Sequence, residues 1–465
     1  MPMHKERAVA GNQGITEGVI WKQLLFFFFP ILLGTFFQQL YNTADAIIVG
    51  KFVGKEALAA VGGTTGTLIN LIVGFFVGLS SGATVILSQY YGARNHEDAS
   101  RTVHTAIAMA IFGGLVLMGV GVLVSRTILG WLNTPEDVLP LAVTYIRIYF
   151  CGMIPSLIYN IGSGILRAVG DSKRPLYFLI ASCLLNIVLD VILVVGFEMG
   201  VGGAALATIL SQAGSAVLVI ITLMRSPRPL KLEIKKIRLH LDLLPRIVRI
   251  GLPAGFQSVM FSLSNLIIQS AINSFGTDTI AGYTAYGKMD GLFWMVSGAF
   301  GVSVTTFVAQ NFGAKKFDRM RKSTRVGLAL HAGTTIVLSA LLVLLGRPLL
   351  HLFTDEEVVM EHGLMIQRFL VPCFITYTCV EILSGSIRGA GDSLRPMIMT
   401  LLGICLLRVL WVKFIAPLRP DSLLFMLTCY PLSWAFTSVL FVIYYKSDRW
   451  FVRCKKKAGF DTAED

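Results

Sequence analysis

Charged residues are scarce in this sequence: they make up 14% of its 465 residues, whereas hydrophobic residues make up 54%. Soluble globular domains carry roughly 25% charged residues, and the mean hydropathy here is +0.70. The composition therefore excludes an ordinary soluble domain and indicates a protein that lies largely within a lipid bilayer. The charge that is present leans to one sign, because 40 Lys and Arg residues face 27 Asp and Glu residues, for a net charge of +13.

Motifs for bound nucleotides and metals are also missing. The sequence contains no G-x-x-x-x-G-K-[ST] loop for ATP and no H-E-x-x-H zinc motif. Its seven cysteines form no C-x-x-C pair, and most lie in apolar stretches, where cysteine behaves as a small hydrophobic residue. The apolar run that begins at Phe26 is far longer than the core of a cleavable signal peptide. We therefore expect no enzyme, no cofactor, no metal site and no disulfide framework.

Two short motifs occur twice, each time displaced by 221 residues. The stretch S-G-I-L-R-A-V-G-D-S-K-R-P at Ser163–Pro175 returns as S-G-S-I-R-G-A-G-D-S-L-R-P at Ser384–Pro396, and Gln89–Ala93 returns as Gln310–Ala314. Two matches with one displacement predict that the chain holds two copies of one unit. A duplicated apolar unit is typical of a transporter whose site lies between or within its halves.

Apolar runs long enough to cross a hydrocarbon core of about 30 Å recur along the chain. We expect an all-α membrane protein with twelve transmembrane helices, at about 24–49, 57–89, 102–125, 138–167, 175–196, 201–224, 246–273, 280–312, 325–346, 358–387, 396–416 and 422–445. These spans predict a short N-terminal arm (1–23), a first half (24–224), a basic linker (225–245), a second half (246–445) and a tail (446–465).

Lys and Arg residues are concentrated in every second loop, in the linker and near both termini. Short cytoplasmic loops carry such an excess, so we expect both termini in the cytoplasm and the protein in the cell (inner or plasma) membrane. Because the positive charge follows this alternation, it indicates membrane topology and not nucleic-acid binding.

Ionisable side chains inside apolar spans are costly and therefore mark candidate functional sites. Asp45 in the first span and Asp190 in the fifth both lie roughly 7–10 Å below the outer surface, at about 1.5 Å per residue. Asn186 precedes Asp190 by four residues and so shares its helix face, and Thr208 in the sixth span lies at a similar depth. We predict that these four side chains converge in the outer part of the first half.

Two carboxylates held away from water raise each other's affinity for a proton, and their oxygens also suit a small hard cation. A proton or cation held there could be exchanged for a substrate. The alternative is structural, with Asp45 capping a kinked helix and Asp190 pairing with a distant basic group.

The second half does not repeat this cluster, because Trp411 stands where Asp190 would recur. Its own buried charges, Asp290, Glu381 and Arg408, form a candidate charged site. We expect Glu381 and Arg408 to form a structural ion pair, with a role in ion or substrate passage as the alternative. The nearby apolar side chains Phe293, Trp294, Met295 and Phe300 are expected to serve in packing or lipid contact more than in binding flat cations.

The repeated motifs resemble those of the multidrug and toxic compound extrusion (MATE) family. The resemblance rests on Q-x-x-G-A after the second and eighth spans and on R-x-x-G-D-S-x-R-P after the fourth and tenth, and it covers residues 14–445. It implies a V-shaped pair of pseudo-symmetric six-helix bundles and antiport of organic cations against protons or sodium.

Within that family, the N-x-x-x-D run at Asn186–Asp190, together with Asp45, is similar to the branch of the DNA-damage-inducible F proteins. In that branch an aspartate of the first helix, Asn and Asp of the fifth and a Thr of the sixth form the cation site. The resemblance implies those roles for Asp45, Asn186, Asp190 and Thr208. It also places Pro30 where the branch is proposed to bend its first helix when the aspartate is protonated.

We therefore expect a secondary active efflux transporter that exchanges cationic or amphipathic small molecules for protons or sodium by alternating access. A lipid-linked saccharide flippase is the alternative, but a cavity for a diphosphate is expected to carry several basic residues, whereas the first half carries Asp45 and Asp190. The coupling ion and the substrate stay open, because the same oxygens suit a proton or sodium. The internal duplication favours a monomer.

Overall fold

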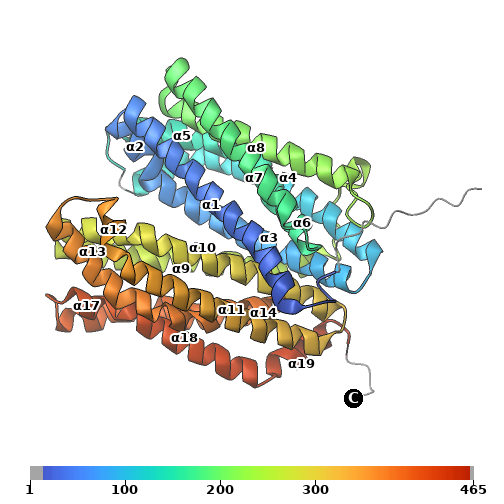
Figure 1. Ribbon diagram of the computed structural model, residues 1–465. Coiled ribbons are helices and arrows are strands. Elements are labelled where there is room, and N and C mark those ends of the chain that lie inside the picture. The colour runs from blue at the N-terminus through green and yellow to red at the C-terminus, as the bar shows by residue number, and fades with distance from the viewer. Residues whose placement is uncertain (1–13, 133, 461–465) are drawn as a thin grey trace, which may run out of the picture.

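The computed structural model describes residues 14–132 and 134–460, and these residues form helices and no β-strand (Figure 1). The helices of the first half are α1 (Ile20–Phe52), α2 (Lys55–Gly62), α3 (Thr64–Gly92), α4 (His96–Trp131), α5 (Leu139–Cys151), α6 (Met153–Ala168), α7 (Lys173–Asp190) and α8 (Gly200–Arg225).

The second half begins after the linker. Its helices are α9 (Leu244–Ile272), α10 (Thr277–Gly313), α11 (Phe317–Leu344), α12 (Gly346–His351), α13 (Glu357–Leu370), α14 (Thr378–Gly389), α15 (Leu394–Thr400), α16 (Leu407–Leu410), α17 (Leu423–Leu427), α18 (Cys429–Lys446) and α19 (Arg449–Lys457). Wider π-helical turns occupy Val191–Gly196, Leu401–Leu406 and Trp411–Ile415.

The described residues contain eleven helical segments that are long and apolar enough to cross a membrane, and up to twelve if a bent pair counts as one span. That pair is α5 and α6, which bend by 52° where they meet at Gly152. A side chain at Gly152 would collide with Ile209 of α8, so glycine allows the bent span to pack there. The predicted all-α membrane fold is confirmed, and the predicted fourth span, 138–167, is this bent pair.

The two halves lie side by side and spread apart toward the end of the molecule that carries α2, α12 and α17 (Figure 1). They meet at the opposite end, where α1 begins and α19 lies; we call this the terminal end. The helices α3 and α9 form the main contact between the halves. Gly78 and Gly82 of α3 face the backbone around Gly255 and Gly251 of α9, so the two helices touch without intervening side chains.

The repeated Q-x-x-G-A motif fastens the halves to each other at the terminal end. Gln89 of the first half donates a hydrogen bond of 2.8 Å to the carbonyl of Gly389 in the second half. Gln310, its counterpart, donates one of 2.6 Å to the carbonyl of Ala168 in the first half. The two bonds are related by the sequence repeat, and each crosses the interface. We call this pair the glutamine latches.

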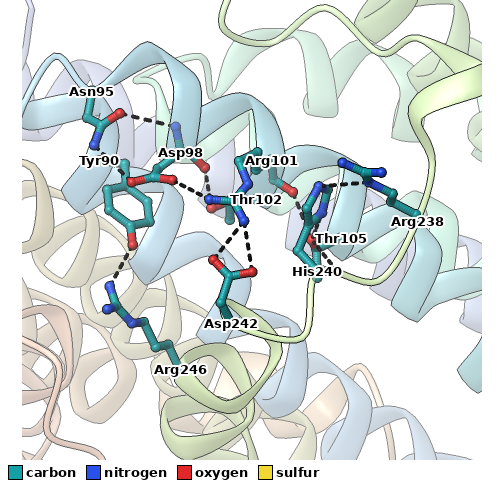
Figure 2. Close-up of polar contacts among 10 residues, drawn as sticks. All are labelled: Tyr90, Asn95, Asp98, Arg101, Thr102, Thr105, Arg238, His240, Asp242 and Arg246. Atoms are coloured by element: carbon teal, nitrogen blue, oxygen red, sulfur yellow. Dashed lines mark hydrogen bonds and ion pairs between the residues drawn. The ribbon is translucent and has the colours of Figure 1, made fainter.

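Polar contacts connect the linker to α4 (Figure 2). The guanidinium of Arg101 forms a two-pronged ion pair with Asp242, at 2.8 and 2.7 Å. Thr105 Oγ1 lies 2.9 Å from His240 Nδ1, and Arg238 donates to His240 Nε2 at 3.2 Å. We call residues 238–242 the strap, because they join α4 of the first half to α9 of the second.

Both ends of the described chain pack against the second half. Arg319 of α11 donates hydrogen bonds to the carbonyls of Ile15, Glu17 and Gly18. The expected tail forms the helix α19, whose Trp450 is fully buried. Residues 1–13 of the expected arm and 461–465 of the tail lie outside the described residues.

Candidate functional site

The structure places all four predicted site residues of the first half in the protein interior. Asp45 is 5% exposed and Thr208 2%, while Asn186 and Asp190 are fully buried. They lie on α1, α7 and α8, and α7 packs against both of the other helices. The carboxyl groups of Asp45 and Asp190 are within electrostatic reach of each other. The structure therefore brings the two carboxylates together on packed helices, and the convergence of all four side chains stays a prediction.

The polar atoms of this cluster have no partners among the described residues. Asp45 Oδ1, both carboxylate oxygens of Asp190, both side-chain polar atoms of Asn186 and Thr208 Oγ1 are buried without a hydrogen bond within residues 14–132 and 134–460. Leaving one such group unpaired costs about 1–3 kcal/mol, so the cluster is expensive as it stands. Neither aspartate forms an ion pair with a described basic residue, which contradicts the alternative of a distant partner for Asp190. The donor set fits a proton or a small cation held by oxygen atoms.

Tyrosine side chains from α1 and α5 lie near the two carboxylates. Tyr41 and Tyr145 both lie within electrostatic reach of Asp45 and Asp190, and Tyr149 lies one turn beyond Tyr145, with its ring stacked on it. Tyr41 and Tyr145 thus add two tyrosines near the carboxylates. Sequence reasoning missed the two tyrosines of α5, because the bend between α5 and α6 cannot be recognised from the pattern of apolar residues.

A π-helical turn, Val191–Gly196, begins directly after Asp190. Such widened turns are rare and frequently lie at functional sites. A π-helical turn also occupies the corresponding place in the second half, at Trp411–Ile415. The irregular backbone therefore recurs in both halves, whereas the carboxylate of Asp190 is replaced by Trp411.

Pro30 lies inside α1, which runs as one helix from Ile20 to Phe52. It lines a small cavity of about 80 Å³ within the first half, with Gln38, Asn160 and Arg167 among the other lining residues. The missing backbone donor of a proline weakens a helix at that point, so α1 can bend next to this cavity.

In the second half, Asp290 of α10 accepts hydrogen bonds from the Tyr286 hydroxyl at 3.2 Å and from the Trp294 indole at 2.7 Å. These residues line a cavity of about 320 Å³ between the halves, together with Tyr283 and Tyr430. We call it the aromatic cavity. Aromatic faces around a carboxylate can hold an organic cation.

Arg408 is fully buried but does not line the aromatic cavity. It donates hydrogen bonds to Ser433 at 2.9 Å and Asn265 at 3.1 Å, and its guanidinium lies 4.5 Å from the ring centre of Tyr430. Arg408 thus faces α18 and α9.

The predicted ion pair between Glu381 and Arg408 is wrong. Glu381 instead accepts a hydrogen bond from the Tyr377 hydroxyl at 3.2 Å and packs over Gly301 of α10. It faces α10 while Arg408 faces α18 and α9, so among the described residues the two side chains have separate partners. The predicted charged site of the second half is therefore divided, with Asp290 in one cavity and Glu381 in another.

The second of these, the central cavity, has a volume of about 500 Å³ and lies between the halves, toward the terminal end. Its charged lining residues are Arg167, Arg388 and Glu381, and the other lining residues are mainly glycines, hydroxyl-bearing and apolar side chains. The central cavity shares Ser262 and Trp294 with the aromatic cavity, so the two adjoin. Phe293 and Phe300 are fully buried in the core, whereas Trp294 lines both cavities.

One sequence pattern of hydrolases does occur in the chain. Gly78–Gly82 reads G-L-S-S-G and so matches G-x-S-x-G. In a hydrolase this motif forms a sharp turn between a strand and a helix, but here it lies in the middle of α3. The match therefore does not indicate a nucleophilic serine.

Comparison with known proteins places the chain among transporters. The MatE family model matches residues 30–192 and 253–412, one segment in each half. "Probable multidrug resistance protein YoeA" of Bacillus subtilis (strain 168) is 28% identical over 435 residues, covering 92% of this chain and 94% of its own. "Probable multidrug resistance protein YpnP" of the same organism is 27% identical over 442 residues, covering 94% and 97%. A solved structure titled "Outward-facing conformation of a multidrug resistance MATE family transporter of the MOP superfamily" matches with a TM-score of 0.88 at 20% identity, covering 97% of this chain and 99% of its own.

Proposed function

This chain belongs to the MatE family, and we propose that it is a cation-coupled antiporter that exports drugs or toxic metabolites from the cell by alternating access. Its relatives are named as multidrug resistance proteins, which supports efflux of this kind over a lipid-linked saccharide flippase. The resemblance to the DNA-damage-inducible F branch remains a prediction from Asp45, Asn186, Asp190 and Thr208.

The observation that carries the proposal is the buried cluster of unpaired polar atoms in the first half. We assign the coupling ion, a proton or sodium, to the oxygens of Asp45, Asp190 and Thr208, with Asn186 as a further donor or acceptor. Occupancy relieves the cost of the unpaired atoms and so stabilises the conformation that binds the ion. Exchange follows if substrate stabilises another conformation, because each ligand shifts the equilibrium only by its difference in affinity for the two states.

Substrate is assigned to the aromatic cavity and the adjoining central cavity. The two cavities lie between the halves, where a relative movement of the halves would open them to one side at a time. In the state described here the halves are joined by the glutamine latches at the terminal end. The excess of Lys and Arg near that end supports a cytoplasmic orientation for it, which makes this the state that is closed to the cytoplasm.

Pro30 offers the link between the two sites in this proposal. It lies on the same helix as Asp45 and lines the small cavity that Arg167 also lines. A change of charge at Asp45 that bends α1 would move the part of α1 at the terminal end. There the ring of Phe28 stacks on that of Phe300 in the second half, with 4.1 Å between the ring centres.

The proposal is tested with purified protein in liposomes loaded with the fluorescent cation rhodamine 123. A proton gradient and then a sodium gradient are imposed on the wild type and on the Asp45→Asn and Asp190→Asn variants. We expect one gradient to drive dye movement in the wild type and neither to do so in the variants. Asp318→Asn is the control, because Asp318 is exposed on α11. Undiminished movement in both variants would remove the cluster from the mechanism.

A further inference from the structure

The central cavity carries a pair of arginines that the coupling mechanism does not use. Arg167 ends α6 and Arg388 ends α14, and they occupy the same place in the repeated R-x-x-G-D-S-x-R-P motif. Each half therefore contributes one guanidinium to the same cavity. A side chain that only ended a helix could face solvent or lipid headgroups, but both of these line the space between the halves.

The charges around the central cavity do not cancel. Glu381 is the one carboxylate among the described lining residues, and it lies within electrostatic reach of Arg388 but not of Arg167. Arg388 also donates a hydrogen bond to Ser384 at 3.3 Å. Within residues 14–132 and 134–460, no carboxylate forms an ion pair with Arg167. The cavity as described thus has an uncompensated positive charge on the first-half side.

The guanidinium groups also have nitrogen atoms without partners. Nε of Arg167 and Nε of Arg388 are buried and make no hydrogen bond to the described residues. An arginine presents a planar fork of donors that matches the oxygens of a carboxylate or phosphate. Holding two guanidinium groups at one cavity is costly in a membrane protein, and an acidic group between them would offset that cost.

We propose that the central cavity binds the acidic group of a zwitterionic amphipathic substrate, through Arg167 and Arg388. Its cationic group would then lie in the adjoining aromatic cavity, against Asp290 and the tyrosine rings, because Trp294 and Ser262 border both spaces. The inference rests on the proposed function in that it takes these cavities as the substrate site. It narrows the substrate class from organic cations to molecules that carry both charges.

A matched pair of dyes tests this class directly. Rhodamine 110 carries a free carboxylate, and rhodamine 123 is its methyl ester, so the two differ in that group alone. Their dissociation constants are measured by fluorescence anisotropy on purified full-length protein, with no membrane and no gradient. We expect the wild type to bind the free acid roughly tenfold more tightly than the ester. One charge-assisted hydrogen bond contributes a difference in affinity of about this size.

Variants show which residues cause the preference for the free acid. The affinity ratio of about ten is expected to fall to about one in Arg167→Gln and in Arg388→Gln, and to be partly kept in Arg167→Lys, which retains the charge but not the planar fork. Arg325→Gln is the matched control, because Arg325 is exposed on α11 and lies outside the cavity lining, so the ratio should stay near ten. Size-exclusion profiles of all variants establish that they fold.

Equal affinities in the wild type, no binding of either dye, or a ratio unchanged in both Gln variants would overturn the proposal. Its failure is separable from that of the proposed function. Tighter binding of rhodamine 110 than of rhodamine 123, without gradient-driven movement, would reject the antiporter and keep the acidic-group site. Gradient-driven movement of rhodamine 123 with equal affinity for the two dyes would reject the acidic-group site and keep the antiporter.

Discussion

Thr208 and Thr437 are both buried threonines in apolar helices, and only Thr437 has a partner for its hydroxyl. Thr437 Oγ1 donates a hydrogen bond of 2.7 Å to the carbonyl of Ser433. Thr208 Oγ1 is buried without a hydrogen-bond partner among the described residues, as are the side-chain polar atoms of Asn186 and Asp190. A protein that keeps such unpaired groups sacrifices some stability, and functional sites are where that occurs.

Replacing Thr208 with the isosteric valine is therefore expected to raise the melting temperature while it lowers transport. The valine removes an unpaired polar group, a gain in stability of about 1 kcal/mol, and also removes an oxygen from the proposed ion site. Thr437→Val is the control, and its melting temperature should fall because a hydrogen bond is lost. Thermal unfolding of the purified variants measures both. A lower melting temperature for Thr208→Val would show that its hydroxyl is structural.

Asp290 allows a second prediction at this scale. Asp290→Asn removes the negative charge among the rings of the aromatic cavity, so the affinity for rhodamine 123 should fall by roughly tenfold. Asp278→Asn, at an exposed position in the first turn of the same helix, should leave the affinity within about twofold. Anisotropy titration measures both, and equal loss in the two variants would contradict a cation site at Asp290.

The sequence indicated the buried carboxylates of the first half better than the cavities. Asp45 and Asp190 stand out because a carboxylate within an apolar span is rare, and spacing then selects Asn186. Tyr145 and Arg167 could not be selected in this way, since a tyrosine or an arginine near a span end is common in membrane proteins. Only the packing of α5 and of the two halves places them at a site.

At the scale of elements, the glutamine latches hold together the ends of helices that belong to different halves. Gln89 lies on α3 and reaches the end of α14, while Gln310 lies on α10 and reaches the end of α6. Opening the terminal end must break both bonds together. Each glutamine donates to a carbonyl at the end of a helix. When the terminal end opens, water can replace the glutamine as the partner of that carbonyl.

The variant Gln89→Ala/Gln310→Ala should shift the protein toward a state that is open at the terminal end. Spin labels at Lys173→Cys and Leu394→Cys, in a background without native cysteines, report the distance between the starts of α7 and α15. Double electron–electron resonance is expected to show a larger share of long distances in the variant, because two lost hydrogen bonds shift the equilibrium by roughly five- to a hundredfold. Gln269→Ala, whose partner Asn273 lies in the same half, is the control. An unchanged distance distribution would mean that the latches do not hold the gate.

The strap carries two titratable groups, His240 and Asp242, whose pKa values are shifted by its attachment. Burial, together with the nearby Arg101 and Arg238, lowers the pKa of His240 from its usual value of 6.5. Desolvation alone would raise the pKa of Asp242, but a backbone hydrogen bond and Arg101 outweigh it, so the pKa of that carboxyl is also lowered. A group whose pKa is lowered by attachment stabilises the attached strap at pH values above the usual pKa of that group. This stabilisation is lost as the pH falls.

Acidification from pH 7.5 to 5.5 should therefore loosen the strap through His240, while Asp242 stays ionised over this range. The detached histidine takes up a proton more readily than the attached one, which favours detachment. Hydrogen exchange of the amides at 238–242, corrected for the intrinsic rate, is expected to rise by roughly two- to tenfold. His240→Gln should remove the pH dependence, and an equal rise in that variant would assign it to another group.

On the scale of the whole molecule, the fold is duplicated but the chemistry is not. The repeated motifs predicted the two halves, and the structure shows what the repeats do: they join the halves through Gln89 and Gln310 and place Arg167 and Arg388 in one cavity. Asp45 and Asp190 have no acidic counterparts in the second half, so the proposed ion site belongs to one half. The division into cavities could not be predicted, because it depends on how the halves lean on each other.

The central claim is that two sites shift the same conformational equilibrium: an ion site in the first half and a substrate site between the halves. Proton release on addition of rhodamine 123 to purified protein, in weakly buffered detergent solution with a pH indicator, tests it most directly. A sodium-selective electrode covers the other ion. We predict release of one of the two ions by the wild type and none by the Asp45→Asn/Asp190→Asn variant, although that variant still binds the dye. Binding without release in the wild type, or equal release from the variant, would contradict the coupling.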